Sequence, residues 1–226
     1  MNRALKMSSR MLIPVLICLA LLLVVLVWGN RPAFTERERL IINKSDSLMY
    51  VTVLPEDSVI LRTVSIDLGA RELRSPLLRT LMDKMLYSVQ DPSQDGVGIA
   101  APQVGINRRI VCVQRLDKDG EPFECYPNIR IESLFGPVSS GPEGCLSVPG
   151  MRGMVPRHAG VVISYVHPET LENKRDTVEG FTAVIFQHEC DHLDGILYID
   201  RADTVYTNPA WIAEREAYSY EKPAWW

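Results

Sequence analysis

The stretch FTAVIFQHECDHLDG at residues 181–195 decides the fold that we expect for this chain. It predicts a helix from Phe181 to Leu193, which Gly195 ends as a C-terminal cap. Residues four apart share one face of a helix, so His188 and His192 would lie side by side there. Glu189 follows the first histidine directly. The sequence therefore predicts a helix that carries two imidazoles and a carboxylate close together.

Two histidines on one helical face can each direct a ring nitrogen at the same metal ion. Glu189 would lie beside that ion, where it could handle a proton of a bound water molecule. Half of the four histidines of the chain fall within this five-residue span. Two solvent-exposed helix histidines are the simpler alternative, but the motif favours a metal site.

A catalytic metal site needs a third protein ligand and an open position for water. Cys145, in the stretch EGCLS at 143–147, is our candidate. Alone, a cysteine is more often a small buried apolar residue. Here Gly144 lets the backbone come close to the site, and the N–H of Leu146 would point where an oxyanion could form. A thiolate ligand suits iron(II), zinc, nickel or cobalt, and the sequence does not choose among them.

The stretch GVGIAAPQ at 96–103 consists largely of small residues, so another group must approach its backbone closely. A phosphate-binding loop is one alternative, but the lysine and Ser/Thr that such a loop needs are missing. A tightly packed turn is the other alternative. Gln103 favours a catalytic role, because its amide can donate a hydrogen bond to a developing oxyanion.

The rest of the chain predicts one further helix and several strands. Ser75 can cap a helix over 76–90, with Pro76 at its first position and apolar residues at helical spacing. Strands are predicted at Ser47–Leu54, Val59–Val64, Arg109–Gln114, Asn128–Leu134, Gly160–Val166 and Lys174–Val178, and a short strand or extended segment at Ile196–Ile199. We therefore expect an α+β fold with antiparallel strands around a central metal-binding helix.

The start of the chain has a different character. Arg3, Lys6 and Arg10 precede an uncharged run from Met11 to Trp28, and a helix of that length spans roughly 27 Å, about a bilayer core. We expect a hydrophobic helix that serves as signal anchor or signal peptide at 1–29, a polar linker or short helix at 30–46 and the catalytic domain at 47–226. Residues 11–28 would then contact the membrane. The protein would be membrane-anchored or exported, with its catalytic domain slightly favoured outside the cytoplasm. A buried core helix is the alternative, but no polar stripe marks this run.

Two of the five cysteines can face each other across a hairpin. If Lys118 and Asp119 form the loop between residues 109–115 and 122–126, Cys112 falls opposite Cys125. A disulfide between them is one hypothesis, and two small buried apolar residues are the favoured one. The cysteine spacings contain no C-x-x-C pair, so they exclude a zinc ribbon and a thioredoxin motif.

Three segments together resemble the peptide deformylases. That family has a G-x-G-x-A-A-x-Q stretch, then E-G-C-L-S, then a Q-H-E-x-D-H-x-x-G helix. The chain has GVGIAAPQ at 96–103, EGCLS at 143–147 and QHECDHLDG at 187–195, each complete and in that order. The resemblance covers roughly residues 48 to 201. It implies an enzyme that hydrolyses the formyl group from N-formylmethionyl peptides or proteins.

The resemblance also implies roles for individual residues. Cys145, His188 and His192 would hold one divalent metal, which is usually iron(II) in this family. Glu189 would act as general base and then as general acid, while Gln103 and the N–H of Leu146 would stabilise the oxyanion. The residues expected to contact the substrate, including its methionine side chain, are Gly96, Val97, Gly98, Phe181, Val184 and Ile185.

Other functions agree less well with the sequence. A metallopeptidase could share H-E-x-x-H, but no histidine follows His192 as a third ligand, and the other two motifs would stay unexplained. A deformylase-like protein that binds formyl-peptides or metal without turnover would not need Glu189 as a base. The net charge of −4 gives no sign of nucleic-acid binding, which would need a clustered basic face. Loop Asp91–Asp95 and a tail without a basic helix depart from the family pattern.

Overall fold

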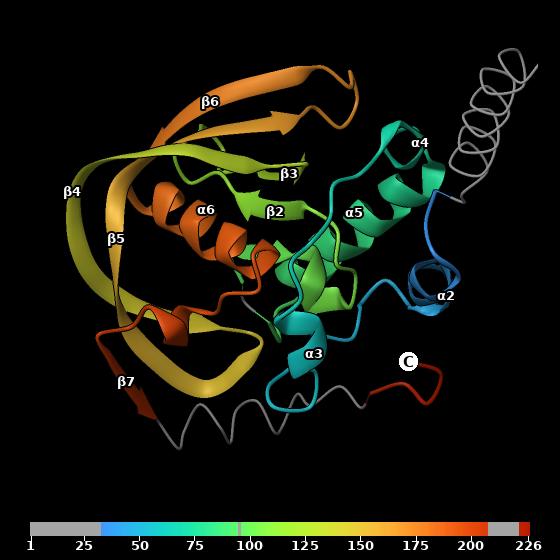
Figure 1. The fold of residues 1–226 in the computed structure, drawn as a ribbon, viewed down its shortest axis with the longest axis horizontal. Helices are drawn as coiled ribbons and strands as arrows, with labels where there is room; N and C mark the ends of the chain where they lie inside the picture. Colours follow the sequence, from blue (N-terminus) through green and yellow to red (C-terminus); the bar gives the residue numbers. More distant parts are fainter. Residues whose placement is uncertain (1–32, 95, 208–221) are drawn as a thin grey trace, which may run out of the picture. The chain divides into compact units, whose positions relative to one another are not determined.

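The computed structural model describes residues 33–94, 96–207 and 222–226. The chain divides into two compact units, Met1–Thr35 and Glu36–Trp226, and every element below belongs to the second. Its named strands pair only in antiparallel fashion, in one sheet of order β1-β2-β3 and another of order β4-β5-β6 with β7 paired to β5. The α+β class with antiparallel strands is therefore confirmed (Figure 1).

The described helices are α2 (Glu36–Lys44), α3 (Ser58–Leu61), α4 (Ala70–Leu73), α5 (Pro76–Gln90) and α6 (Gly180–Leu193), with short 3₁₀ turns η1 (Ala101–Val104) and η2 (Tyr198–Asp200). The strands are β1 (Gly98–Ala100), β2 (Ile110–Gln114), β3 (Phe123–Pro127), β4 (Arg130–Cys145), β5 (Val148–Val166), β6 (Asn173–Glu179) and β7 (Thr204–Thr207).

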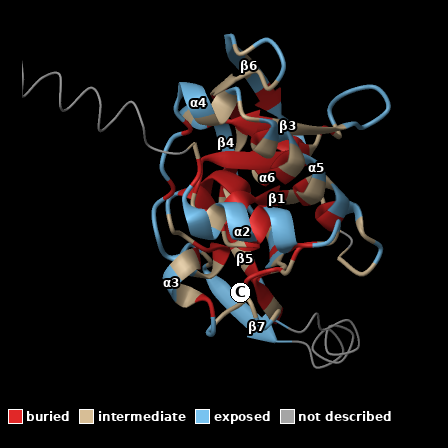
Figure 2. Ribbon diagram, turned by 90° about the vertical axis from the view of Figure 1, so that its right-hand side faces the viewer, coloured by how far each residue is buried: buried red, intermediate tan, exposed pale blue. Residues whose placement is uncertain are grey.

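Helix α6 lies at the centre of this unit, between the long strands β4 and β5 and the small sheet β1-β2-β3 (Figure 1). Ten of its fourteen residues are buried. Figure 2 shows buried residues in red around the α6 label. Phe186 and Leu193 pack into a core with residues of β2, β5 and β6. The helix ends at Leu193, and Gly195 two residues later has a φ of 72°, a left-handed conformation that glycine adopts without strain. The predicted helix and its C-terminal cap are both confirmed.

Helix α5 also begins and ends where the sequence predicts. The Ser75 hydroxyl accepts a hydrogen bond from the N–H of Leu77 at 3.2 Å, and Pro76 occupies the first turn. Its buried face consists mainly of Leu78, Leu81, Met82, Met85 and Val89. Helix α5 thereby covers the small sheet and supports β1, the strand of the glycine-rich stretch.

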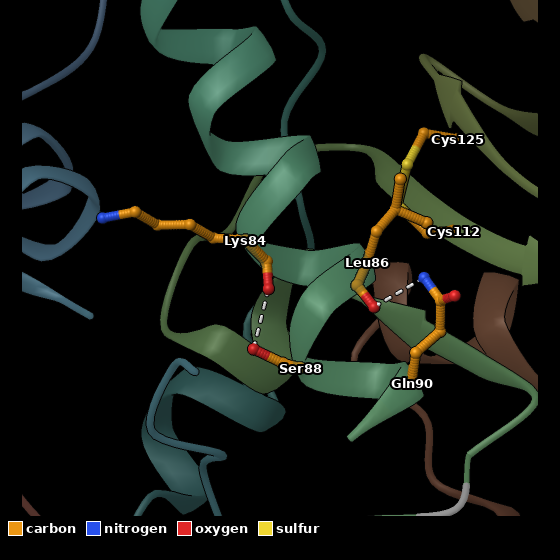
Figure 3. The surroundings of a disulfide bond; sticks show 6 residues. All are labelled: Lys84, Leu86, Ser88, Gln90, Cys112 and Cys125. Atoms are coloured by element: carbon orange, nitrogen blue, oxygen red, sulfur yellow. Dashed lines mark hydrogen bonds between the residues drawn. A yellow bond between two sulfur atoms is a disulfide. The ribbon is translucent and has the colours of Figure 1, made fainter. Parts of the chain in front are cut away.

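The hairpin of β2 and β3 has the predicted register, with Cys112 opposite Cys125. The two sulfurs form a disulfide, with a Cα–Cα distance of 4.1 Å. Figure 3 shows this bridge beside Leu86 of α5. The favoured interpretation, two separate buried apolar residues, was wrong, and the disulfide hypothesis is confirmed. Ile99 of β1 pairs with Cys112 on its other side, so the bridge lies one strand away from the glycine-rich stretch.

Several local predictions were wrong. Residues 58–61 form helix α3 instead of a strand, because Asp57 accepts at its backbone oxygen the N–H groups of Ile60 and Leu61. The expected strand Ser47–Leu54 is not formed, and its residues make single backbone bonds to loops instead, such as that from Thr52 to Gln103. Of the short strand or extended segment expected at Ile196–Ile199, Leu197 is extended, but Tyr198 and Ile199 belong to the η2 turn. Strands β4 and β5 are far longer than predicted.

The Met11–Trp28 run and the expected hydrophobic helix lie outside the described residues. Within residues 33–94, 96–207 and 222–226, no helix combines the length and apolar character needed to cross a membrane. In the expected linker 30–46, the structure has helix α2, so the short-helix alternative holds for residues 36–44.

Candidate metal centre

Three potential metal ligands meet where the end of β4 lies against α6. Cys145 comes from β4, and His188 and His192 come from successive turns of α6. One donor atom from each lies within 4.8 Å of the other two, and Cys145 Sγ is 3.2 Å from Nε2 of His192. One thiolate and two imidazoles are a donor set that fits zinc or iron in a catalytic site with three protein ligands.

The surroundings favour the thiolate form of Cys145. Burial alone would raise the pKa of this thiol, but the adjacent His192 and His188 lower it well below its ordinary value. The N–H of Ser147 points at the sulfur over 3.4 Å, and the Gln103 amide nitrogen lies 3.6 Å away. The thiolate is the form that binds metal, and here the protein surroundings alone already favour it.

Glu143 fixes the ring of His188. Its Oε2 lies 2.8 Å from Nδ1 of His188, which leaves Nε2 of that ring for a metal. Arg157 donates to both oxygens of the same carboxylate, to Oε1 at 2.8 Å and to Oε2 at 3.1 Å. Burial would raise the pKa of Glu143, but the bonds from His188 and Arg157 lower it to about 2. The carboxylate is therefore a permanent anionic acceptor.

Gln103 is held in one orientation at the end of the glycine-rich stretch. Its side-chain oxygen accepts the N–H of Ala100 at 2.8 Å, so the amide nitrogen faces Cys145 and the Ser147 hydroxyl. The backbone oxygen of Gln103 accepts the N–H of Thr52 at 2.8 Å. The residue is 2% exposed. A fixed donor thus points toward the metal-ligand cluster.

Glu189 lies beside the ligands and against the glycine-rich strand. A Cβ added at Gly98 would lie 2.6 Å from Oε1 of Glu189 and 2.9 Å from Cγ2 of Ile185. Only glycine lets β1 come this close to α6. The other carboxylate oxygen, Oε2, is buried and accepts no hydrogen bond from any residue that the structure describes. Among the protein groups alone, burial raises the pKa of Glu189 to about 7, which suits a group that both takes and gives a proton.

The expected substrate residues are brought together only in part. Gly98 contacts Ile185, and the half-buried Val97 packs against the cluster that contains Ile185. Gly96 lies beside Val89 and Leu146. Val184 is half-buried and Phe181 is 59% exposed at the start of α6.

A separate cavity of about 570 Å³ lies between β4, β5 and the other face of α6. Arg109, Arg157, Asp191 and Arg201 are among its lining residues, and none of the three candidate ligands is. The arginines there already pair with carboxylates, such as Asp191 with both Arg157 and Arg201. Its lining also includes His158, Cys190 and Asp194, but among the residues that the structure describes only Cys145, His188 and His192 bring their donor atoms together as a metal site would need. We therefore assign the chemistry to the cysteine–histidine cluster.

The family model described as polypeptide deformylase matches residues 50–208. The chain belongs to the peptide deformylase family. It is accordingly a metal-dependent hydrolase that removes the N-formyl group from peptides.

Individual relatives agree with this membership. The chain is 36% identical over 157 residues to a peptide deformylase of Leptospira biflexa, covering 66% of this chain and 86% of that one. It is 41% identical over 141 residues to a peptide deformylase of Desulforudis audaxviator, covering 61% and 86%. A class I type b peptide deformylase from Acinetobacter baumannii, solved with Met-Ala-Ser bound, superposes with a TM-score of 0.61 at 36% identity, over 68% of this chain and 98% of that one.

The expectation of a membrane-anchored or exported deformylase, with an extracytoplasmic catalytic domain, is corrected by these matches. The alignment with the Leptospira relative takes up 86% of that enzyme and so leaves little of it outside the shared domain. The run that prompted the expectation is a bulk hydrophobic pattern, which does not by itself determine where a catalytic domain acts.

Two residues of the site, Glu143 and Tyr198, were not predicted from the sequence. Glu143 stands in the EGCLS motif but was not singled out, although its place two residues before Cys145 in a strand-like stretch was a usable signal. The ring of Tyr198 stacks on that of His188, with centroids 6.0 Å apart and an interplanar angle of 19°. It comes from η2, whose position beside α6 has no signal in the sequence.

Proposed function

We propose that the chain hydrolyses N-formylmethionyl peptides at a single divalent metal held by Cys145, His188 and His192. The observation that carries the proposal is the convergence of these three donors within 4.8 Å, beside a buried carboxylate with a free oxygen. A bound divalent ion would supply a Lewis acid that makes water a competent nucleophile near neutral pH. Iron(II) is the ion expected from the family, and zinc, nickel or cobalt would suit the same donors.

Glu189 moves the protons in this proposal. Its unpartnered Oε2 takes the proton of the attacking water and later delivers it to the amine that leaves as the C–N bond breaks. A pKa near 7 fits both steps, since the group can exist as carboxylate and as acid around neutral pH. Burial beside Gly98 and Ile185 keeps bulk water from competing for that proton.

Gln103 and Leu146 stabilise the charge that develops on the formyl oxygen. The Gln103 amide nitrogen already points toward the ligand cluster, and its orientation is fixed by the bond from Ala100. Leu146 follows Cys145 directly in the turn between β4 and β5, which leaves its N–H beside the third ligand. Donors that are fixed before the reaction lose no free energy in reorienting.

The substrate pocket would use the start of α6 and the glycine-rich strand. Val97 and Ile185 provide a buried apolar wall for a methionine side chain, and Val184 and Phe181 extend it toward solvent. The close approach of Gly98 to Glu189 leaves room for only a small acyl group next to the carboxylate. The Acinetobacter relative was solved with a methionine-initiated tripeptide, which supports the same preference here.

The test is metal-loaded protein incubated with formyl-Met-Ala-Ser, with the released amine followed over time. We expect amine release from this peptide and none from acetyl-Met-Ala-Ser. We expect Glu189→Ala to lower kcat by roughly 10²–10⁴-fold with the metal retained. Glu169→Ala, at an exposed loop position, is the matched control. Full activity in Glu189→Ala would remove the assigned base, and metal binding without amine release would favour a binding protein.

A further inference from the structure

The segment 222–226 folds back onto the loop that holds Gln103. The indole of Trp226 packs on Gly105, since a Cβ added at that glycine would lie 2.3 Å from two atoms of the ring. Gly105 has a φ of 82° and ends the η1 turn, where its N–H bonds to the backbone oxygen of Pro102 at 3.0 Å. The ring therefore covers the residue that closes the turn carrying Gln103.

The same indole contacts the other support of Gln103. The ring of Tyr50 meets that of Trp226 edge to face, with centroids 5.1 Å apart. Two residues after Tyr50, Thr52 donates its N–H to the backbone oxygen of Gln103 at 2.8 Å. Its hydroxyl donates to the backbone oxygen of Pro102 at 3.0 Å. Trp226 thus lies against both the turn and the extended segment that fixes the turn.

Lys222 closes the arrangement through the buried Asp57. The ammonium group pairs with one carboxylate oxygen of Asp57 and lies 5.7 Å from the centre of the Tyr50 ring. The other oxygen accepts the Tyr50 hydroxyl at 2.8 Å and the N–H of Val53 at 3.1 Å. One carboxylate therefore links the segment 222–226 to residues 50–53 on both sides of Thr52.

We propose that Trp226 and Lys222 are positioning residues for catalysis, which hold the Gln103 turn so that its amide stays aimed at the substrate oxygen. The proposal rests on the function proposed above for Gln103. Neither residue touches the reacting atoms. Their effect passes through Gly105 on one side and through Tyr50 and Thr52 on the other. Small displacements of an oxyanion donor lower the rate of the chemical step more than substrate binding.

The experiment is a double-mutant cycle on full-length, metal-loaded protein with formyl-Met-Ala-Ser. We expect Trp226→Ala to lower kcat by about tenfold with KM nearly unchanged, and Trp226→Phe to restore most of that loss. In a Gln103→Ala background, the same Trp226→Ala change should have no further effect on kcat, because the donor it positions is gone. Tyr87→Ala, at an exposed aromatic ring of α5, is the matched control.

The outcomes distinguish a failure of the role proposed for Gln103 from a failure of the positioning role proposed for Trp226 and Lys222. If Gln103→Ala leaves kcat unchanged, the role proposed for Gln103 fails, and the positioning role fails with it. If Gln103→Ala lowers kcat and Trp226→Ala lowers it by the same factor in both backgrounds, only the positioning role is overturned. Lys222→Ala is a milder second variant, which keeps the cycle measurable if the Trp226→Ala protein does not fold. If Lys222→Ala lowers kcat by the same factor with and without Gln103, that result overturns the positioning role as well.

Discussion

Glu143 Oε2 lies 2.8 Å from Nδ1 of His188, and this one contact connects the metal ligand to a buried charge network that includes Arg157 and Asp191. A carboxylate that accepts the second ring N–H fixes the tautomer of a ligating histidine and its direction. We expect Glu143→Gln to weaken metal affinity roughly 10–100-fold while the fold persists. Competition with a chelator measures this, with Glu132→Gln on the exposed part of β4 as control. Equal affinities in both variants would separate Glu143 from the metal site.

At Gly98, a single added methyl group should displace the catalytic carboxylate of Glu189. Gly98→Ala would put a carbon atom 2.6 Å from Oε1 of Glu189, so the carboxylate or β1 must move. We expect kcat/KM to fall by about 10²-fold, with a loss of stability of about 1–3 kcal/mol. Gly141→Ala has open space around the added methyl and serves as control. Unchanged kinetics in Gly98→Ala would show that β1 does not confine Glu189.

The Cys112–Cys125 bridge should stabilise the domain without taking part in the reaction. It closes a loop of 13 residues, for which chain entropy predicts a contribution of about 3 kcal/mol to the free energy of unfolding. Denaturant unfolding of metal-free protein with and without reductant measures it. A Cys112→Ala/Cys125→Ala variant should be destabilised and insensitive to reductant. A midpoint that reductant does not shift in the unaltered protein would refute the bridge as a stabilising link.

Arg115 should make stability depend on pH. It is 2% exposed and donates to Asp117 at 2.8 and 2.6 Å, and these bonds lower the pKa of Asp117 below 3.8. A lowered carboxyl pKa contributes stability above the unfolded value, and that contribution is lost as the pH falls through the folded one.

We expect Arg115→Met to lose about 2 kcal/mol at pH 7, and to lose less as the pH drops below about 3.8. Unfolding free energies of both proteins between pH 7 and pH 3 give the comparison. A difference between them that stays constant over this range, or grows toward low pH, would contradict the assignment.

The elements that the sequence predicts well are those whose signals are local. Ser75 and Pro76 mark the start of α5, and Gly195 marks the end of α6, because capping chemistry lies within a few residues of each terminus. The facing of Cys112 and Cys125 also followed from a local turn. The three ligands could be proposed because their motifs are short and specific.

The long strands could not be predicted in the same way. β4 contains Gly136, Pro142 and Gly144 and is interrupted by three register shifts against β5, so its sequence lacks the regular alternation of a strand. Its length is set by pairing with distant residues of β5. Likewise, Trp226 and Gly105 are more than a hundred positions apart in the chain, and no local sequence pattern predicts their contact.

The central claim is that Cys145, His188 and His192 bind one catalytic metal ion. Titration of metal-free protein with cobalt(II), followed by absorption, tests it most directly, since a thiolate ligand gives a sulfur-to-metal charge-transfer band. We expect one equivalent of cobalt(II), this band, and deformylation of formyl-Met-Ala-Ser that rises with the bound fraction. We expect Cys145→Ala to lack the band and the activity. A Cys145→Ala protein that keeps both would contradict the account.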